Sequence, residues 1–302
     1  MTWQVIAAAR ALWHHAAMDA PAPPRTASPA SPATSAAPAA GHDAAGTLRR
    51  MRQQRRISQL ELSLRVGVSQ RHLSCIETGR ARPSRAMLHA LLDALDAPLD
   101  ARNQALLAAG FAPAYTRRTL DHAEMAPVRD ALAQLLAAHD PAPAFVLDEG
   151  WNLLQANRGT VAMMGLLGVP PTALAGGLNL LRALLAPGGL AGALVNADEV
   201  CAEVWQRAQR EAAHSPALRA LVDELRPQLP RRLAGPLPER PAAPLLATVL
   251  RTTDGGTLAF HSAFTTFGAP LDVTAASLRV EHFFPADEAT RRRLADAVAA
   301  AG

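Results

Sequence analysis

The sequence predicts a multidomain protein, an all-α domain of five helices followed by an α+β domain with an antiparallel sheet. Residues 1–45 are rich in Ala, Pro, Ser and Thr in irregular order, a composition that buries too little surface to fold, so we expect a disordered tail. Residues 46–112 place leucines at helical spacing between Ser and Gly boundaries, which predicts helices. From residue 141 short apolar runs are separated by Asp-Gly turns, which predicts strands and helices over 141–302, with a connecting helix in 113–140.

Charge divides the chain in the same way. The 302 residues carry 30 basic side chains, all of them Arg, and a net charge of +4. Residues 46–118 hold 13 Arg against 5 acidic residues, a net of +8, whereas residues 119–302 hold 15 Arg against 19 acidic residues, a net of −4. A concentrated basic patch favours a polyanion through counterion release, so we expect the all-α domain to bind nucleic acid.

Cysteine and hydropathy patterns exclude several classes of protein. Cys75 and Cys201 lie far apart without a CxxC motif, which indicates neither a disulfide framework nor a zinc site. No apolar run reaches the roughly 18 residues of a membrane span. The N-terminal VIAAARALW is interrupted by Arg10 and lacks a basic start, so no signal peptide is predicted and we expect a cytoplasmic protein.

Residues 58–83 predict two short helices joined by a tight turn. Ser58 is a suitable N-cap with Glu61 as its capping-box partner. The first helix is expected to pack through Leu60, Leu62, Leu64 and Val66. Gly67 permits the sharp turn, and Ser69 is placed to cap the second helix.

The second helix collects polar side chains at its start and turns Leu73 and Ile76 to the core. Those polar residues are Gln70, Arg71, His72 and Ser74, and Arg80 and Arg82 follow the helix. Gln pairs bidentately with adenine and Arg with guanine. A helix that enters the major groove by its N-terminus reads base edges with such residues at its first turn. The pattern predicts binding to double-stranded DNA.

These residues resemble the helix-turn-helix of the XRE family of bacterial and phage repressors. The matching positions are Ser58-Gln59, Glu61-Leu62, Gly67-Val68-Ser69, Leu73-Ser74, Ile76-Glu77, Gly79-Arg80 and Arg82-Pro83-Ser84. The resemblance implies a lambda-repressor-like fold in which Gln59 clamps a phosphate and Gln70 and Arg71 read bases. In the preceding helix, Arg49, Arg50, Arg52, Arg55 and Arg56 are expected to be solvated or to touch phosphate. The alternative is an Arg-rich helical hairpin that only packs.

The second domain has the order of elements of a PAS-like fold. A hairpin around residues 148–150 precedes helices over 158–167, 179–185, 198–213 and 217–225 and a Pro-rich loop over 227–244. Two strands flank a turn at 254–256, and a third carries Leu278, Val280, Phe283 and Phe284 before a last helix from Asp287. The resemblance to a PAS-type domain implies that the sheet and helices enclose a small-molecule pocket.

The chain from residue 46 onward also resembles the MmyB-like (MltR-like) regulators. The matching residues are Pro143-Ala144-Phe145-Val146, Asp148, Trp151-Asn152, Ala156-Asn157-Arg158, Val195-Asn196, Thr266-Phe267-Gly268-Ala269-Pro270, Asp272-Val273-Thr274 and Phe283-Phe284-Pro285-Ala286-Asp287. Ala269 stands where Thr is expected. The resemblance implies a PAS-like domain that binds a fatty-acid-like ligand and modulates DNA binding.

Five residues are candidates for ligand binding: Trp151, Asn157, Arg158, Asn196 and Phe264. Asn157 and Arg158 open a helix, where backbone N–H groups and a guanidinium can hold a carboxylate. The alternative, which we favour, is a capping Asn and a solvated Arg, and Asn196 likewise fits a cap first. His261 has no partner at ligand spacing, so neither a metal site nor a cofactor is predicted, and no GxSxG, Cys-His, Walker or HExxH motif supports an enzyme.

We therefore expect a sequence-specific transcriptional regulator that senses a small lipophilic acid. A homodimer on a pseudo-palindromic operator is expected, because one recognition helix reads only a few base pairs. Two rival interpretations are a helix-turn-helix protein-interaction or antitoxin-type module without ligand sensing, and an enzyme within the second domain. The size of the second domain disfavours the first, and the missing catalytic motifs disfavour the second.

Overall fold

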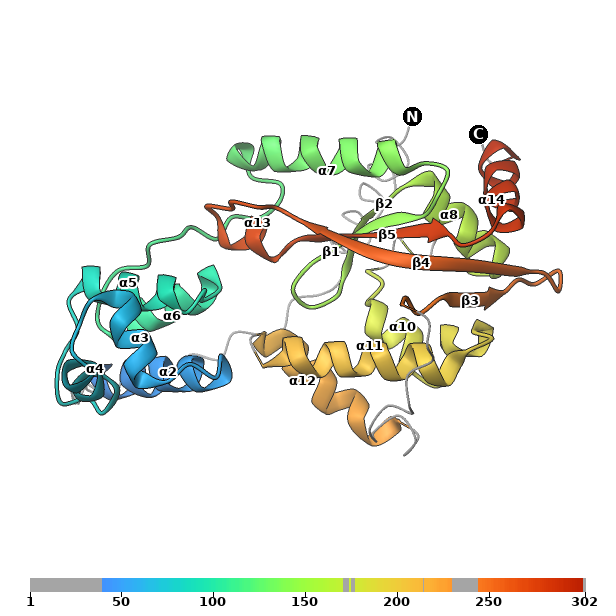
Figure 1. Cartoon of the computed structure of the whole chain (residues 1–302). Coiled ribbons are helices and arrows are strands. Elements are labelled where there is room, and N and C mark those ends of the chain that lie inside the picture. The colour runs from blue at the N-terminus through green and yellow to red at the C-terminus, as the bar shows by residue number, and fades with distance from the viewer. Residues whose placement is uncertain (1–39, 171–173, 175–176, 214, 230–243, 301–302) are drawn as a thin grey trace, which may run out of the picture. The chain divides into compact units, whose positions relative to one another are not determined.

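The computed structural model describes residues 40–170, 174, 177–213, 215–229 and 244–300. The described chain forms two compact units (Figure 1). One holds residues 40–118 together with Ala269–Ala276, and the other holds Thr119–Gly268 and the chain from Ser277. Residues 1–39 of the predicted tail and 230–243 of the predicted loop lie outside the described residues. Residues 40–45 are helical, so the first helix begins before the predicted boundary at residue 46.

Five helices within residues 40–118 form most of the first unit, as the sequence predicts. They are α2 (Ala40–Gln54), α3 (Gln59–Val66), α4 (Gln70–Glu77), α5 (Arg85–Ala94) and α6 (Leu99–Ala108). The hydroxyls of Ser58, Ser69 and Ser84 accept hydrogen bonds from backbone N–H groups of α3, α4 and α5, which stabilises these helix starts. Gly67 adopts φ 73°, a left-handed conformation that favours glycine, and there the chain turns from α3 to α4.

The core of this unit corrects two expectations. Leu62, Leu73 and Ile76 are buried among leucines of α5 and α6, but Leu60 and Leu64 are 53% and 72% exposed. Alternate positions of a helix with 3.6 residues per turn diverge around the axis, so four of them cannot share one buried face. Arg52, expected at the surface, is buried and ion-paired with Glu77.

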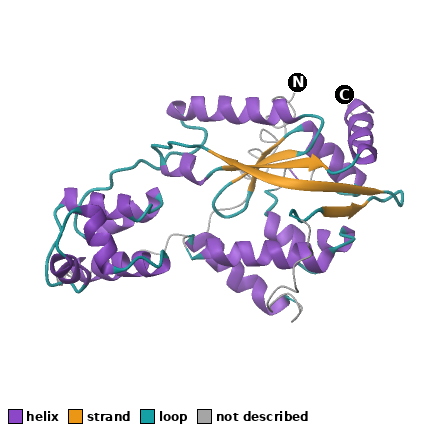
Figure 2. Cartoon of the chain, viewed as in Figure 1, coloured by secondary structure: helices purple, strands orange, loops and turns teal. Residues whose placement is uncertain are grey.

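A five-stranded antiparallel sheet forms the centre of the second unit (Figure 2). Its strands are β1 (Ala144–Leu147), β2 (Leu153–Ala156), β3 (Thr248–Arg251), β4 (Thr257–Thr266) and β5 (Arg279–Pro285), in the order β2-β1-β5-β4-β3. The predicted hairpin pairs β1 with β2, and β5 lies between β1 and β4 at the centre.

Helices cover both faces of the sheet. On one face α7 (Ala126–His139), which follows a short 3-10 turn η1 (Ala123–Met125), packs through Leu132 and Leu136 against β1 and β5. The other face packs against a larger cluster that includes Trp151, Trp205 and Phe260. Its helices are α8 (Arg158–Leu166), α10 (Leu180–Leu185), α11 (Ala197–Ala212), α12 (Pro216–Leu225) and α14 (Glu288–Ala300), with 3-10 turns η2 (Leu190–Ala193) and η3 (Arg226–Gln228). The predicted connecting helix is therefore part of the sheet unit.

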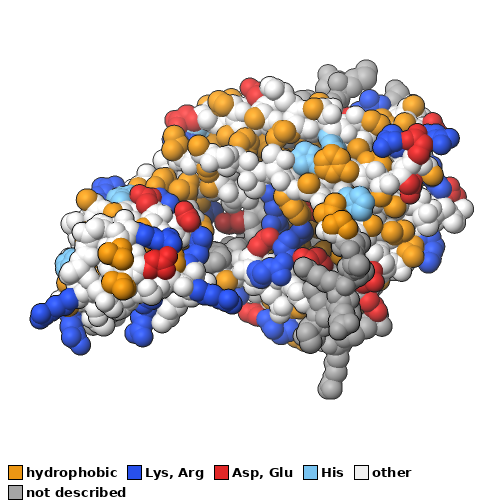
Figure 3. Space-filling model, in the orientation of Figure 1, with side chains coloured by type: hydrophobic (Ala, Val, Ile, Leu, Met, Phe, Trp, Pro, Cys, Tyr) orange, Lys and Arg blue, Asp and Glu red, His pale blue; other side chains and the backbone are white. Residues whose placement is uncertain are grey.

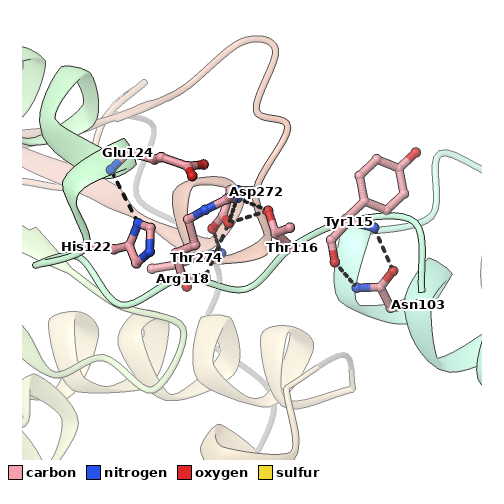
Figure 4. Close-up of polar contacts among 8 residues, drawn as sticks. All are labelled: Asn103, Tyr115, Thr116, Arg118, His122, Glu124, Asp272 and Thr274. Atoms are coloured by element: carbon pink, nitrogen blue, oxygen red, sulfur yellow. Dashed lines mark hydrogen bonds and ion pairs between the residues drawn. The ribbon is translucent and has the colours of Figure 1, made fainter. Parts of the chain in front are cut away.

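A short helix, α13 (Val273–Ser277), interrupts the connection between β4 and β5 where no helix was predicted. Asp272, just before it, accepts hydrogen bonds from the backbone N–H of Thr274 and from the Thr116 hydroxyl, both at 2.9 Å (Figure 4). The Val273 N–H also donates to the Thr116 carbonyl at 2.8 Å. Residues 269–276 are thereby bonded to the chain that follows α6.

Candidate functional site

The exposed side of α4 presents the polar residues that the sequence assigned to DNA. Gln70, Arg71 and His72 are exposed at its first turn, while Leu73 and Ile76 are 0% and 1% exposed on the opposite side. Arginine side chains project from this unit near α4 (Figure 3). The first turn of α4 is thus free of the core and is supported from behind by leucines, the arrangement that reading of base edges requires.

The other predicted DNA contacts occupy several environments. Ser69 is exposed and its hydroxyl caps α4 through the His72 N–H at 3.1 Å. Ser74 is half-buried, and Arg80 and Arg82 are exposed. Arg82 donates from Nη2 to the Ala109 carbonyl at 3.3 Å. Gln59 donates from Nε2 to Glu77 Oε2 at 2.8 Å, so one of its two amide hydrogens is already engaged.

A cavity of about 170 Å³ lies in the second unit between the sheet and its larger helical layer. Leucine, methionine, valine and phenylalanine side chains form most of its wall, including Phe145, Met163, Leu184, Leu194, Leu250 and Phe283. Phe145 lies on β1 and Phe283 on β5, with Ser262 of β4 on the same face by register. The cavity is therefore an apolar chamber built on one sheet face.

One corner of the cavity is charged. Glu203 and Arg207 of α11 and Glu281 of β5 line it. The Arg207 guanidinium carbon lies 4.6 Å from the Trp151 ring centre and 4.4 Å from that of Phe264. Arg207 Nη2 stands 3.9 Å from Glu281 Oε2, the far limit of an ion pair. Burial raises the pKa of Glu281 and lowers the pKa of Arg207, since both charged forms lose solvent there.

A second arginine completes the surroundings of Trp151. Arg279 of β5 lies 4.6 Å from the Trp151 ring centre and donates from Nη1 to Glu211 Oε2 at 2.6 Å. The Trp151 indole N–H donates to the same carboxylate oxygen at 2.7 Å. Glu211 therefore pairs with Arg279, while Arg207 faces Glu281 at 3.9 Å on the cavity side.

The five predicted ligand residues do not line the cavity. Trp151 and Phe264 contact Arg207 from outside the wall. Asn157 is buried, and its side chain caps α8 through the Thr160 N–H and donates to the Ala142 carbonyl at 2.7 Å. Arg158 donates to the Val298 carbonyl at 3.0 Å, and Asn196 donates to the Ala247 carbonyl at 2.8 Å. The capping alternative fits Asn157, whereas Asn196 holds β3 through the Val249 N–H.

The sequence reasoning missed Arg207 and Glu281, although each breaks a pattern. Arg207 is half-buried on α11, next to the buried Ala208 and seven residues after the buried Val200. Glu281 is buried on β5 between Val280 and His282, and Phe283 follows it on the same face of the strand. Charged side chains are rarely buried without a partner, so a charge in line with core-facing residues is the signal that could have marked both positions.

Comparison with known families assigns both units. Residues 128–297 match the MmyB-like transcription regulator ligand binding domain, and residues 43–105 match a helix-turn-helix domain. The chain belongs to the MmyB-like transcription regulators. This MmyB-like regulator therefore joins a helix-turn-helix domain to the ligand-binding domain of that family. Both matched families are regulator domains rather than enzymes.

Other comparisons with the MmyB-like regulator are distant. No curated protein matches it. A solved structure of an RNA-binding light-oxygen-voltage receptor is 14% identical with a TM-score of 0.24, covering 87% of this chain. The regulator spans 64% of that receptor, less than two thirds of its length. Among the described residues, no helix of the MmyB-like regulator has the length and hydropathy to cross a bilayer.

Proposed function

We propose that this regulator binds double-stranded DNA through an XRE-type helix-turn-helix and that its ligand is a small lipophilic acid. The main support for this ligand class is an apolar cavity with Arg207 in its charged corner. Apolar walls favour a hydrocarbon, and a guanidinium in a desolvated corner favours a carboxylate through charge-assisted hydrogen bonds. An acid with a lipophilic body satisfies both.

The cavity volume indicates the size of an acid that it can hold. Its 170 Å³ slightly exceeds the ~150 Å³ of an engineered apolar cavity that binds benzene. A short acyl chain or a single aromatic ring attached to a carboxylate fits this space. The resemblance to MmyB-like regulators implies a fatty-acid-like ligand, which agrees with a small lipophilic acid. Octanoate is a suitable probe.

The exposed first turn of α4 supports the DNA-binding part of the proposal. Gln70 and Arg71 are assigned to base edges, and Arg80 and Arg82 to phosphates, with Gln59, Ser69, His72 and Ser74 as further contacts. One such helix covers few base pairs, so a homodimer on a pseudo-palindromic operator is proposed, acting in the cytoplasm. Binding of the acid changes the affinity of that dimer for its operator.

Calorimetry of the full-length chain with octanoate tests the ligand class. Octanoate should bind at least tenfold more tightly than octan-1-ol, since hydrogen bonds to charged groups contribute about 1.5–3 kcal/mol. Arg207→Met keeps the side-chain volume and should remove this preference. Arg210→Ala on the same helix is the control, because that side chain is 61% exposed and pairs with Glu203. Equal binding of acid and alcohol to wild type would refute the proposal.

Selection from random duplexes tests the DNA-binding part. The full-length protein should enrich a sequence with two related half-sites about one helical turn apart, 10–10.5 bp, or multiples of it. Sedimentation of the protein on the selected duplex should give two chains per duplex. An enriched single half-site with one bound chain would contradict the dimer.

A further inference from the structure

Glu281 occupies an unusual position for a carboxylate. It lies on β5, the central strand, with Phe145 of β1 and Phe264 of β4 as its register neighbours, and it is only 5% exposed. Its Oε2 atom is buried and has no hydrogen-bond partner within the described chain. The Arg207 Nη2 atom at 3.9 Å is too distant for a hydrogen bond.

Arg207 is incompletely satisfied as well. Its Nε atom is buried without a hydrogen-bond partner in the described residues. The guanidinium lies over Trp151 and Phe264, which stabilises its charge without using its N–H donors. A donor and an acceptor with unused hydrogen-bonding capacity thus meet at the wall of an apolar cavity, an arrangement that costs free energy unless a ligand satisfies it.

Burial and neighbouring charges act on Glu281 in opposite directions. Burial raises the pKa of Glu281, Arg207 and Arg279 lower it, and Glu211 raises it, with burial the largest effect. Glu203 lines the same corner from α11 and faces Arg210 at 3.4 Å. His261 and His282 alternate to the other face of the sheet, so neither faces the cavity.

We infer that Glu281 is a ligand-recognising residue that carries a proton while an acid occupies the cavity and donates it in a hydrogen bond to the carboxylate of the acid. Two ionised carboxylates in contact repel each other, so the ligand oxygen and Glu281 can meet only when they share one proton. Arg207 then donates to the ligand carboxylate on its other side. This inference rests on the proposed lipophilic-acid ligand.

The inference fixes the proton balance of binding. The proton comes from solvent, resides on the Glu281 carboxyl and returns to solvent when the ligand leaves, and no covalent bond forms or breaks. Each octanoate that binds to protein with ionised Glu281 therefore takes up one proton. Affinity should fall about tenfold for each pH unit above the pKa of Glu281 in the unliganded protein.

Calorimetry with octanoate between pH 6 and pH 9 tests this coupling, using the full-length chain and buffers of low and high ionisation enthalpy. Octanoate stays ionised throughout this range, so a change in affinity reports on the protein. The wild type should show falling affinity towards high pH and proton uptake approaching one per ligand. Glu281→Gln replaces the carboxyl with a neutral amide that still donates, and its affinity should not depend on pH.

Glu203→Gln is the matched control, because it removes the other carboxylate of the same corner and should keep the wild-type pH dependence. Thermal unfolding confirms that both variants are folded, and the two-buffer measurement on wild type needs no variant. Wild-type binding without proton uptake over the whole range would overturn the role of Glu281. The role of Glu281 would also be overturned if Glu203→Gln lost the pH dependence of octanoate affinity while Glu281→Gln kept it. Absence of octanoate binding at every pH would refute the ligand class itself.

Discussion

Arg52 and Glu77 form a buried two-point ion pair that joins the end of α4 to α2. Arg52 Nε donates to Oε1 of Glu77 at 2.7 Å, and Nη2 donates to Oε2 at 2.8 Å. Arg52 Nη1 also donates to the Ile57 carbonyl at 2.9 Å, and Gln59 donates to Glu77. The helix that presents Gln70 and Arg71 is therefore fixed at its far end by residues from α2 and α3.

Removing one partner of this pair should destabilise the first unit strongly. Glu77→Gln and Arg52→Met each leave a buried charge or donor without its counterpart, at a cost of about 3–5 kcal/mol. The free energy of opening, measured by hydrogen exchange of α2 and α4 amides, should fall by that amount. Glu61→Gln breaks the exposed pair with Arg65 and should change it by less than about 0.5 kcal/mol. Similar small changes in all three variants would contradict the importance of the buried pair.

The same pair predicts acid sensitivity of the first unit. Burial raises the pKa of Glu77, but the hydrogen bonds from Arg52 and Gln59 outweigh it, so the folded pKa is lower than the ordinary value. The resulting stabilisation is present above the unfolded pKa of about 4.3 and is lost as pH falls through the folded pKa. Urea titrations of α-helical signal from pH 7 downward should show this loss in wild type. A Glu77→Gln chain that keeps the same acid dependence would show that other carboxylates cause it.

Arg71 and Arg82 should differ in what they contribute to DNA binding. Arg71→Ala should cost about 1–3 kcal/mol on the selected operator and relax the preference at one base pair. Arg82→Ala should weaken all duplexes alike and reduce the slope of log affinity against log salt by about 1. Arg292→Ala removes the same charge in the second unit, where the side chain is 74% exposed, and should change neither. Fluorescence anisotropy on operator and scrambled duplexes measures all three, and equal losses for Arg71→Ala on both duplexes would exclude base reading.

Gly159 and Gly165 lie on the same helix, α8, but should respond to alanine with opposite signs. A Cβ at Gly159 would lie 2.3 Å from the Pro141 carbonyl oxygen and 2.6 Å from that of Ala142, so backbone must shift at a cost of about 1–3 kcal/mol. A Cβ at Gly165 meets nothing within 4 Å, and alanine should stabilise the helix by about 0.5–1 kcal/mol. Hydrogen exchange of α8 and β1 amides distinguishes the two. Equal effects would mean that the contact of Gly159 with 141–142 is unimportant.

Asp272→Asn should release the chain that follows α6. Besides Thr116 and Thr274, Asp272 accepts from Arg118 N and Nη1, both at 3.2 Å. These bonds outweigh burial and keep the pKa of Asp272 low, and the loss of charge-assisted bonds costs about 1.5–3 kcal/mol. Trypsin cleavage after Arg117 and Arg118 should accelerate about tenfold or more. Asp287→Asn, at the start of α14, should leave this rate unchanged, and an unchanged rate in Asp272→Asn would show that cleavage does not depend on Asp272.

Much of the helical architecture was predictable from sequence because its determinants are local. Ser58, Ser69 and Ser84 each bond to an N–H three residues along the chain, so a short window contains the whole interaction. Gly67 and the Asp254 turn likewise depend on neighbours in the chain. The order of strands and helices in the second unit follows from similar local capping and turn residues.

The remaining features depend on contacts between distant residues. Arg52 looks like any arginine of a basic helix until α4 brings Glu77 to it, 25 residues later. Arg207 and Glu281 come together only when α11 packs on the sheet. Short-range sequence patterns do not show which residues of α11 and β5 will be close in space. Helix α13 was missed because the hydrogen bonds of Asp272 come partly from Thr116, 156 residues earlier.

Two separate segments of the chain belong to the first unit, residues 40–118 and Ala269–Ala276. A cut after Arg118 therefore separates the five helices from residues 269–276, where Asp272 bonds to Thr116 and Arg118. In a graft of the five helices onto another sensor, Ala269–Ala276 would stay behind, and Thr116 and Arg118 would lose Asp272 as their hydrogen-bond acceptor.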